Sequence, residues 1–182
     1  MRLLAHFILI LGLLWPGIVA ANDWEALEQP GAFAIMRHAL APGTGDPAAF
    51  DLDDCSTQRN LDDAGSEQAR RIGAAFRERG IAFDAVLTSQ WCRCRDTAQL
   101  LELGPVTEVA AFNSFFRDFD ARAAQTGAAL AEIDARGGRP IIVTHQVNIS
   151  ALTGTGTRSG EVLVVRRGDT GLDVLGSILI AP

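Results

Sequence analysis

The sequence lacks two residue types altogether. Its 182 residues include no Tyr, and all 16 cationic side chains are Arg because Lys does not occur. The absence of Lys excludes Schiff-base chemistry, a Lys nucleophile and a Walker-type phosphate loop, and the absence of Tyr excludes a phenol nucleophile. The formal net charge of -6 argues against nucleic acid as a partner. Any anion site must therefore be a local cluster of Arg in a chain that is acidic on average.

The N-terminal 21 residues have the pattern of a secretory signal peptide. Arg2 precedes a dense apolar run over residues 3–14, and small residues stand before the expected cleavage point after Ala21 or, alternatively, Ala20. The apolar run is short for a membrane span, although an uncleaved anchor helix is the other interpretation. We therefore expect residues 1–21 to be a signal peptide and residues 22–182 to be one exported domain, periplasmic or secreted. Membrane contact is expected only if the N-terminal segment is retained.

Apolar runs and turn residues predict an alternation of strands and helices in the rest of the chain. Five strands are expected near residues 32–36, 83–88, 106–110, 140–144 and 161–166, and a sixth over 172–180. Helices are expected over residues 24–28, 61–79, 92–103, 121–135 and 149–152. Residues 39–60 have no hydrophobic period and predict a long loop, of the kind that is usually functional. The alternation predicts an α/β fold with three layers, in which helices flank a mostly parallel sheet and the last two strands form an antiparallel pair.

Polar residues follow three of these strands. Arg37-His38 ends the first strand, Thr88-Ser89 ends the second with Arg93 soon after, and Thr144-His145 ends the fourth. In parallel sheets, ligands bind beyond the carboxyl ends of the strands. Two guanidinium forks there suit the oxygens of a phosphate dianion, and a neutral imidazole can attack phosphorus as a nucleophile.

Four ordered segments resemble the motifs of the histidine phosphatase superfamily, which has the phosphoglycerate-mutase-like fold. Residues 36–39 resemble its Arg-His-Gly signature, residues 88–98 its second motif, and residues 143–145 the strand that ends in its second His. Residues 59–69 resemble the step into its first helix. The resemblance implies phosphoryl transfer through a phosphohistidine, with no metal and no other cofactor.

The resemblance also implies roles for individual residues. His38 would be the phosphorylated nucleophile, Arg37 and Arg93 would bind the phosphoryl oxygens, and His145 would be the second His of the pocket. Arg59 is expected mainly to hold the loop, with phosphate contact as a lesser expectation. Ala39 stands in place of the usual Gly and would be strained if that position required a positive φ.

The sequence offers several candidates for the catalytic acid. The family's acid position aligns with Asn113, an amide that cannot donate the proton, so another carboxylate is needed if leaving groups are protonated. We select Asp118 as the acid; the other acidic residues on nearby loops are Asp120, Asp46, Asp53, Asp54 and Glu161. A site without an acid would still act on phosphohistidine or aryl phosphates, whose leaving groups need less assistance.

The three Cys residues also bear on the site. None of them is followed by Arg six residues later, which excludes a Cys-dependent phosphatase, and no CxxC spacing suggests a metal site. Three Cys in an oxidising compartment predict one disulfide and one free thiol. We expect Cys55 to pair with Cys92 or Cys94, which would fix the 39–60 loop beside Arg93.

The sequence therefore predicts an exported phosphoric monoester hydrolase. Its substrate would be a phosphomonoester or phosphohistidine, carried by a small molecule or an envelope component. The alternatives are a phosphate-binding module on the same fold without turnover, favoured by the missing acid, and, more remotely, a structural envelope protein with a retained anchor.

Overall fold

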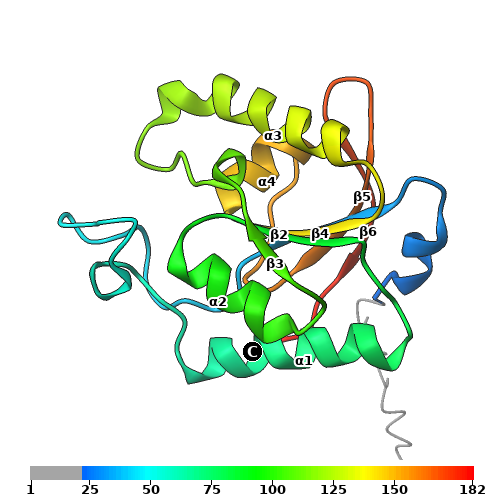
Figure 1. Ribbon diagram of the computed structural model, residues 1–182, viewed down its shortest axis with the longest axis horizontal. Coiled ribbons are helices and arrows are strands. Elements are labelled where there is room, and N and C mark those ends of the chain that lie inside the picture. Colours follow the sequence, from blue (N-terminus) through cyan, green and yellow to red (C-terminus); the bar gives the residue numbers. More distant parts are fainter. Residues whose placement is uncertain (1–21) are drawn as a thin grey trace, which may run out of the picture.

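A six-stranded sheet lies at the centre of the structure, a computed structural model that describes residues 22–182 (Figure 1). The expected signal peptide, residues 1–21, lies outside the described residues. The strands are arranged in the order β3-β2-β4-β1-β5-β6, in which the first four are parallel to one another and β5 pairs antiparallel with both β1 and β6. Their bounds are β1 Phe33–Arg37, β2 Ala85–Thr88, β3 Val106–Glu108, β4 Pro140–Thr144, β5 Val162–Arg167 and β6 Leu172–Ile178. The expected mostly parallel sheet and closing antiparallel pair are confirmed.

Helices cover both faces of the sheet, which gives the expected three layers. In Figure 1, α1 and α2 lie on one side of the sheet, and α3 and α4 lie on the other. Each pair encloses its own apolar core: Phe76 of α1 packs in the first, and Ile133 of α3 packs in the second. The helix bounds are α1 Asp63–Glu78, α2 Cys92–Leu101, α3 Arg122–Arg136 and α4 Gln146–Thr153.

The register of the central strands brings the three polar strand ends together. β4 lies between β1 and β2, so their carboxyl ends meet at one edge of the sheet. The His38 N–H donates to the carbonyl of Thr144 at 3.0 Å, and the Ser89 N–H donates to the carbonyl of Val143 at 3.0 Å. Backbone hydrogen bonds between parallel neighbours therefore fix the relative heights of the three motifs.

Helix α1 fixes the start of the 39–60 loop. Its N-cap Asp62 accepts a hydrogen bond from the Gly65 N–H at 2.7 Å. A Cβ on Gly65 would come within 1.9 Å of the carbonyl oxygen of Leu40, so only Gly permits this approach. The buried Gln68 then accepts a hydrogen bond from the Leu40 N–H at 2.9 Å and donates to the carbonyl of Ser159 at 3.0 Å. The chain that leaves the first strand is thus held against the helix.

The short helix expected over residues 24–28 is present, whereas the helix expected over residues 149–152 requires correction. Residues 24–28 form a 3-10 helix, Trp24–Glu28. Helix α4 begins at Gln146, directly after His145, and is eight residues long, whereas the sequence predicted only residues 149–152. Its buried side chains include the polar Asn148, which interrupts the apolar periodicity by which the start of the helix could have been predicted. Within residues 22–182, no helix is long and apolar enough to cross a membrane.

Candidate active site

The four residues expected to act together line one cavity of about 220 Å³ at the carboxyl edge of the sheet: Arg37, His38, Arg93 and His145. The ring centroids of the two His side chains lie 5.6 Å apart. The guanidinium of Arg93 lies between them, with Nε 3.2 Å from Nε2 of His38 and Nη2 3.3 Å from Nδ1 of His145. The tertiary structure therefore gathers the residues that the sequence placed at three separate strand ends.

His38 has the protonation state that a nucleophile needs. Its Nδ1 lies 2.8 Å from the carbonyl oxygen of Ala39, which can only accept a hydrogen bond, so Nδ1 carries the proton. Nε2 faces the Nε–H of Arg93, which can only donate, and therefore keeps its lone pair. Burial, and then the charge of Arg93, hold the pKa of His38 well below its ordinary value of 6.5. At neutral pH, Nε2 is an unprotonated imidazole nitrogen in the cavity.

His145 is oriented by a chain of hydrogen bonds. Its Nδ1 accepts from Arg93, so its Nε2 carries the proton and donates to Oγ of Ser89 at 2.8 Å. The Ser89 hydroxyl donates in turn to Oδ1 of Asn113 at 3.2 Å. Burial, followed by the charge of Arg93, also holds the pKa of His145 well below 6.5. Ser89 and Asn113 therefore act on the orientation of His145.

Arg37 lines the cavity together with a further Arg, Arg59, and within residues 22–182 Arg37 has side-chain donors without partners. Among the described residues, the side chain of Arg37 makes a single hydrogen bond, from Nη1 to the carbonyl of Thr157 at 3.4 Å, and its buried Nε has no partner there. Buried N–H groups without partners are rare, and a phosphoryl oxygen would satisfy this one. Arg59 donates from Nε to the carbonyl of Gly45 at 2.8 Å and from Nη1 to that of Ala41. It holds the loop, as expected, and also lines the cavity.

The structure does not place Asp118 in the cavity, which corrects the expected assignment of the acid. Asp118 is exposed, and its backbone leads into the 3-10 helix Phe119–Ala121 at the surface. Asp46 is the acidic residue that lines the cavity, and the others that the sequence offered do not: Asp53, Asp54, Asp120 and Glu161. The sequence identified Asp46 only as one of several carboxylates on nearby loops, because a loop without a hydrophobic period does not reveal which of its residues points inward.

Asp46 is bound firmly. Its carboxylate accepts from Nη1 of Arg93 at 2.7 Å and from Nη2 at 3.2 Å. The Nε1–H of Trp91 and the N–H of Arg59 also donate to it, each at 3.2 Å. Burial by itself raises the pKa of Asp46, but the charge of Arg93 and these hydrogen bonds lower it below its usual value. Asp46 is therefore an ionised carboxylate at neutral pH.

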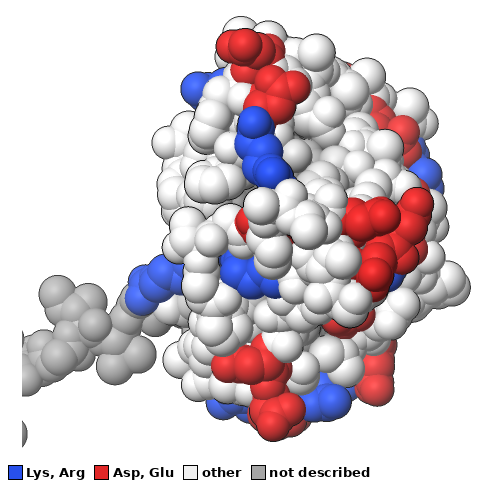
Figure 2. All heavy atoms as spheres, turned by 90° about the vertical axis from the view of Figure 1, so that its left-hand side faces the viewer, with Lys and Arg blue, Asp and Glu red and all other residues white. Residues whose placement is uncertain are grey.

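The mouth of the cavity carries no charge other than that of these groups. The remaining lining residues are Gly43, Thr44, Gly45, Ser114, Phe116, Gln146 and Val147. Phe116 is 45% exposed and places an aromatic ring at the rim. Figure 2 shows the side of the molecule on which the 39–60 loop lies, with Arg atoms visible between uncharged residues near its middle and acidic side chains around them.

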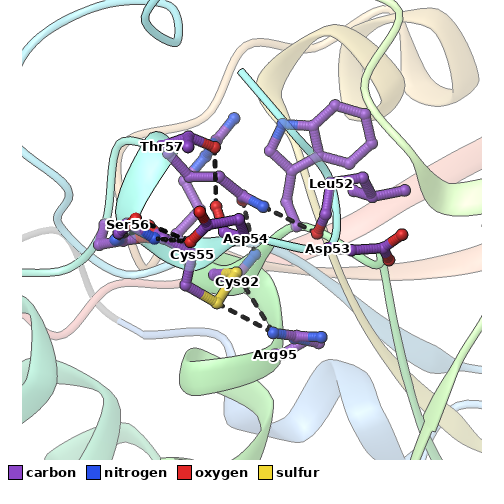
Figure 3. Close-up of a disulfide and its surroundings, with 12 residues drawn as sticks. Leu52, Asp53, Asp54, Cys55, Ser56, Thr57, Cys92 and Arg95 are labelled. Atoms are coloured by element: carbon purple, nitrogen blue, oxygen red, sulfur yellow. Dashed lines mark hydrogen bonds between the residues drawn. A yellow bond between two sulfur atoms is a disulfide. The ribbon is translucent and has the colours of Figure 1, made fainter. Parts of the chain in front are cut away.

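The loop that carries Asp46 is fixed to α2 by a disulfide between Cys55 and Cys92 (Figure 3). This is one of the two pairings that the sequence left open, and it leaves Cys94 as a buried free thiol. Nη2 of Arg95 donates to both sulfur atoms, at 3.0 and 3.2 Å. Gln58 adds a second link, because its Oε1 accepts from the N–H of Cys92 at 3.0 Å. The disulfide and Gln58 thus hold this end of the loop beside Arg93 of α2.

The free thiol of Cys94 lies directly behind the second imidazole, with Sγ 3.5 Å from Nε2 of His145. Burial raises the pKa of this thiol to about 12. Cys94 therefore remains a protonated packing residue and is not a nucleophile.

Comparison with known proteins agrees with this geometry. The profile of the histidine phosphatase superfamily (branch 1) matches residues 34–115, which include Arg37, His38 and Arg93. Over these residues the chain resembles the histidine phosphatase superfamily. No curated protein sequence matches it.

Solved structures of similar fold align with most of the chain. The protein histidine phosphatase SixA, solved in complex with tungstate, aligns with a TM-score of 0.57 and 15% identity over 81% of this chain and 96% of its own. Alpha-ribazole phosphatase from Shigella flexneri aligns with a TM-score of 0.55 and 15% identity, over 79% of this chain and 94% of its own. The protein TTHB049 from Thermus thermophilus aligns with a TM-score of 0.59 and 16% identity, over 82% of this chain and 99% of its own. At such identities the likeness concerns the fold alone.

Two departures from the histidine phosphatase motifs are explained by the structure. Ala39 replaces Gly without strain, because its φ is not positive, and its N–H donates to Oγ1 of Thr97 at 3.0 Å. Asn113, at the position that aligns with the family's acid, accepts hydrogen bonds from Ser89 and from the N–H of Gln90. In this chain, that position helps to orient His145 and supplies no proton.

The buried imidazoles predict a specific pH dependence. The domain 22–182 contains only two His residues. Proton NMR of the imidazoles should therefore show two titrations, each with its midpoint below pH 6.5. The unfolded chain takes up these protons near pH 6.5 and the folded chain does not, so the free energy of unfolding should decrease as the pH falls below 6.5. A His signal that titrates at or above pH 6.5 would contradict the lowered pKa of these buried imidazoles.

Proposed function

We propose that the protein is an exported phosphatase that hydrolyses a phosphomonoester or a phosphohistidine through a phosphohistidine intermediate on His38. The observation that carries this proposal is the unprotonated Nε2 of His38, which faces a cavity lined by three guanidinium groups. The relatives in fold that are named as phosphatases, and the tungstate bound to SixA, support the same conclusion because tungstate is an oxyanion of phosphate-like shape.

The reaction divides into two transfers at phosphorus. First, the lone pair on Nε2 of His38 forms a P–N bond while the bond from phosphorus to the leaving atom breaks, and the leaving group departs with that electron pair. Second, a water oxygen forms a P–O bond, the P–N bond breaks and the electron pair returns to Nε2, while a proton of the water passes to solvent. Arg37 and Arg93 stabilise the charge on the equatorial oxygens in both steps, and His145, which accepts a hydrogen bond from Arg93, helps to hold that guanidinium in the cavity. These side chains perform each transfer without a metal or cofactor.

Export is supported by the signal-like N-terminus and by the disulfide. A Cys55–Cys92 bridge is typical of proteins that fold in an oxidising compartment. The proposed substrate is then a phosphorylated small molecule or an envelope component that such a compartment contains.

Trapping of the intermediate tests the proposed function. The domain 22–182 would be mixed with a ³²P-labelled aryl phosphate and quenched within one turnover. We expect a protein-bound phosphate that is stable in alkali and labile in acid, as a phosphohistidine is, and that is absent from His38→Ala. Phosphate binding without label or turnover would instead support a non-catalytic phosphate-binding module.

A further inference from the structure

The guanidinium of Arg93 presents two different edges, and each has its own partner. The edge formed by Nε and Nη2 faces the two imidazoles, at 3.2 Å from His38 and 3.3 Å from His145. The end formed by Nη1 and Nη2 holds the carboxylate of Asp46, at 2.7 and 3.2 Å. Since a guanidinium is planar and rigid, a partner on one edge fixes the direction of the other. Asp46 therefore determines where Arg93 points within the cavity.

Asp46 is itself held from several sides. The side chain of Asp46 is 7% exposed and that of Arg93 is 3% exposed. The indole of Trp91, which donates to Asp46, stacks on Phe50 of the same loop at 5.1 Å and packs edge-on against His145 at 5.3 Å. Together with Arg59 and the disulfide, these contacts leave the carboxylate little freedom. A buried group so constrained is preorganised to orient its partner.

The charges in the cavity fit this arrangement. Two neutral imidazoles, the three guanidiniums of Arg37, Arg59 and Arg93, and one carboxylate leave two net positive charges. These two positive charges balance the two negative charges of a phosphomonoester dianion. Asp46 thus compensates a buried Arg that would otherwise be expensive to desolvate, without cancelling the attraction for substrate.

We propose that Asp46 is a positioning residue, which holds the Nη1/Nη2 end of Arg93 so that its Nε/Nη2 edge stays directed at the phosphoryl group on His38. The proposal rests on the proposed function. It distinguishes Asp46 from a leaving-group acid: the carboxylate faces Arg93 and Trp91, both of which donate protons in hydrogen bonds, and it is ionised. The site therefore acts through Arg93 and supplies no proton from Asp46.

A double-mutant cycle tests the proposal. The variants are Asp46→Asn, Arg93→Ala and the double variant, each assayed on a series of aryl phosphates and on an alkyl phosphate. We expect Asp46→Asn to lower kcat/KM by about 100-fold, by the same factor on every substrate, so that the dependence on leaving-group pKa is unchanged. In the Arg93→Ala background, the same substitution should have no further effect. Vanadate affinity, measured by calorimetry on the same four proteins, should follow the same cycle and does not require turnover.

Two further variants serve as controls. Asp118→Asn removes a carboxylate that lies outside the cavity and should retain wild-type activity. Trp91→Phe removes the hydrogen bond to Asp46 but keeps an aromatic ring beside Phe50 and His145, and should cause a smaller loss of the same kind as Asp46→Asn. If Asp46→Asn does not fold, as judged by circular dichroism, Trp91→Phe takes its place in the double-mutant cycle with Arg93→Ala.

Three results would overturn the proposal. A loss confined to alkyl phosphates would make Asp46 the leaving-group acid. Faster turnover or tighter vanadate binding by Asp46→Asn would make it a competitor for the phosphoryl position. Full additivity with Arg93→Ala would show that it acts independently of Arg93. The proposed function fails separately, if His38→Ala retains wild-type activity.

Discussion

Replacement of His38 by Ala is expected to lower kcat on an aryl phosphate by at least about 10³-fold. The imidazole is the group that forms the bond to phosphorus, and Cys94, the free thiol near the cavity, is protonated and cannot replace it. The residual rate would reflect the Arg side chains, which still bind and polarise the phosphoryl group. A steady-state assay with 4-nitrophenyl phosphate measures the change.

Vanadate binding provides the control for this substitution. Because Arg37 and Arg93 remain, His38→Ala should still bind the anion, with weaker affinity, while its thermal unfolding stays cooperative. Binding together with loss of turnover separates a missing nucleophile from a collapsed site. A variant with undiminished kcat would contradict the role of His38.

Loss of the Cys55–Cys92 bridge is expected to produce the largest change in stability. The bridge joins residues that are 37 positions apart, and closing such a loop stabilises a protein by about 4 kcal/mol in the chain-entropy description. For a domain of this size, the corresponding fall in Tm is about 10 °C. Cys55→Ser, followed by differential scanning calorimetry, measures it, and the wild-type domain after reduction should behave in the same way.

The thiols provide a check on that experiment. In the folded wild-type domain, Ellman's reagent should detect no reactive thiol, because Cys94 is buried, and after denaturation it should detect one. Because the bridge fixes the loop that carries Asp46, the reduced domain should also show a higher KM for aryl phosphates. An unchanged Tm after complete reduction would show that Arg59, Gln58 and Trp91 hold the loop without the disulfide.

The local signals in the sequence were strong where a short segment decides its own conformation. Asp62 at the start of α1 and Gly80 after its end predicted that helix closely, because capping and positive φ are local requirements. The apolar strands and the polar residues at their ends predicted the parallel sheet and the grouping of Arg37, His38 and His145, since parallel strands end at one edge. The resemblance to the histidine phosphatases added the roles of these residues.

The sequence alone thus determined the elements of the sheet, the polar strand ends and the presence of one bridge from Cys55. The tertiary structure decided which Cys closes that bridge, where α4 begins and, above all, that Asp46 enters the cavity while Asp118 stays outside. The physical reason is that the contacts that place Asp46 join residues far apart in the sequence. Asp46 is positioned by Trp91 and Arg93, which lie 45 and 47 residues further along the chain, and its own segment has no period that could indicate a buried face. Contacts of that kind arise only after the sheet has brought distant segments together.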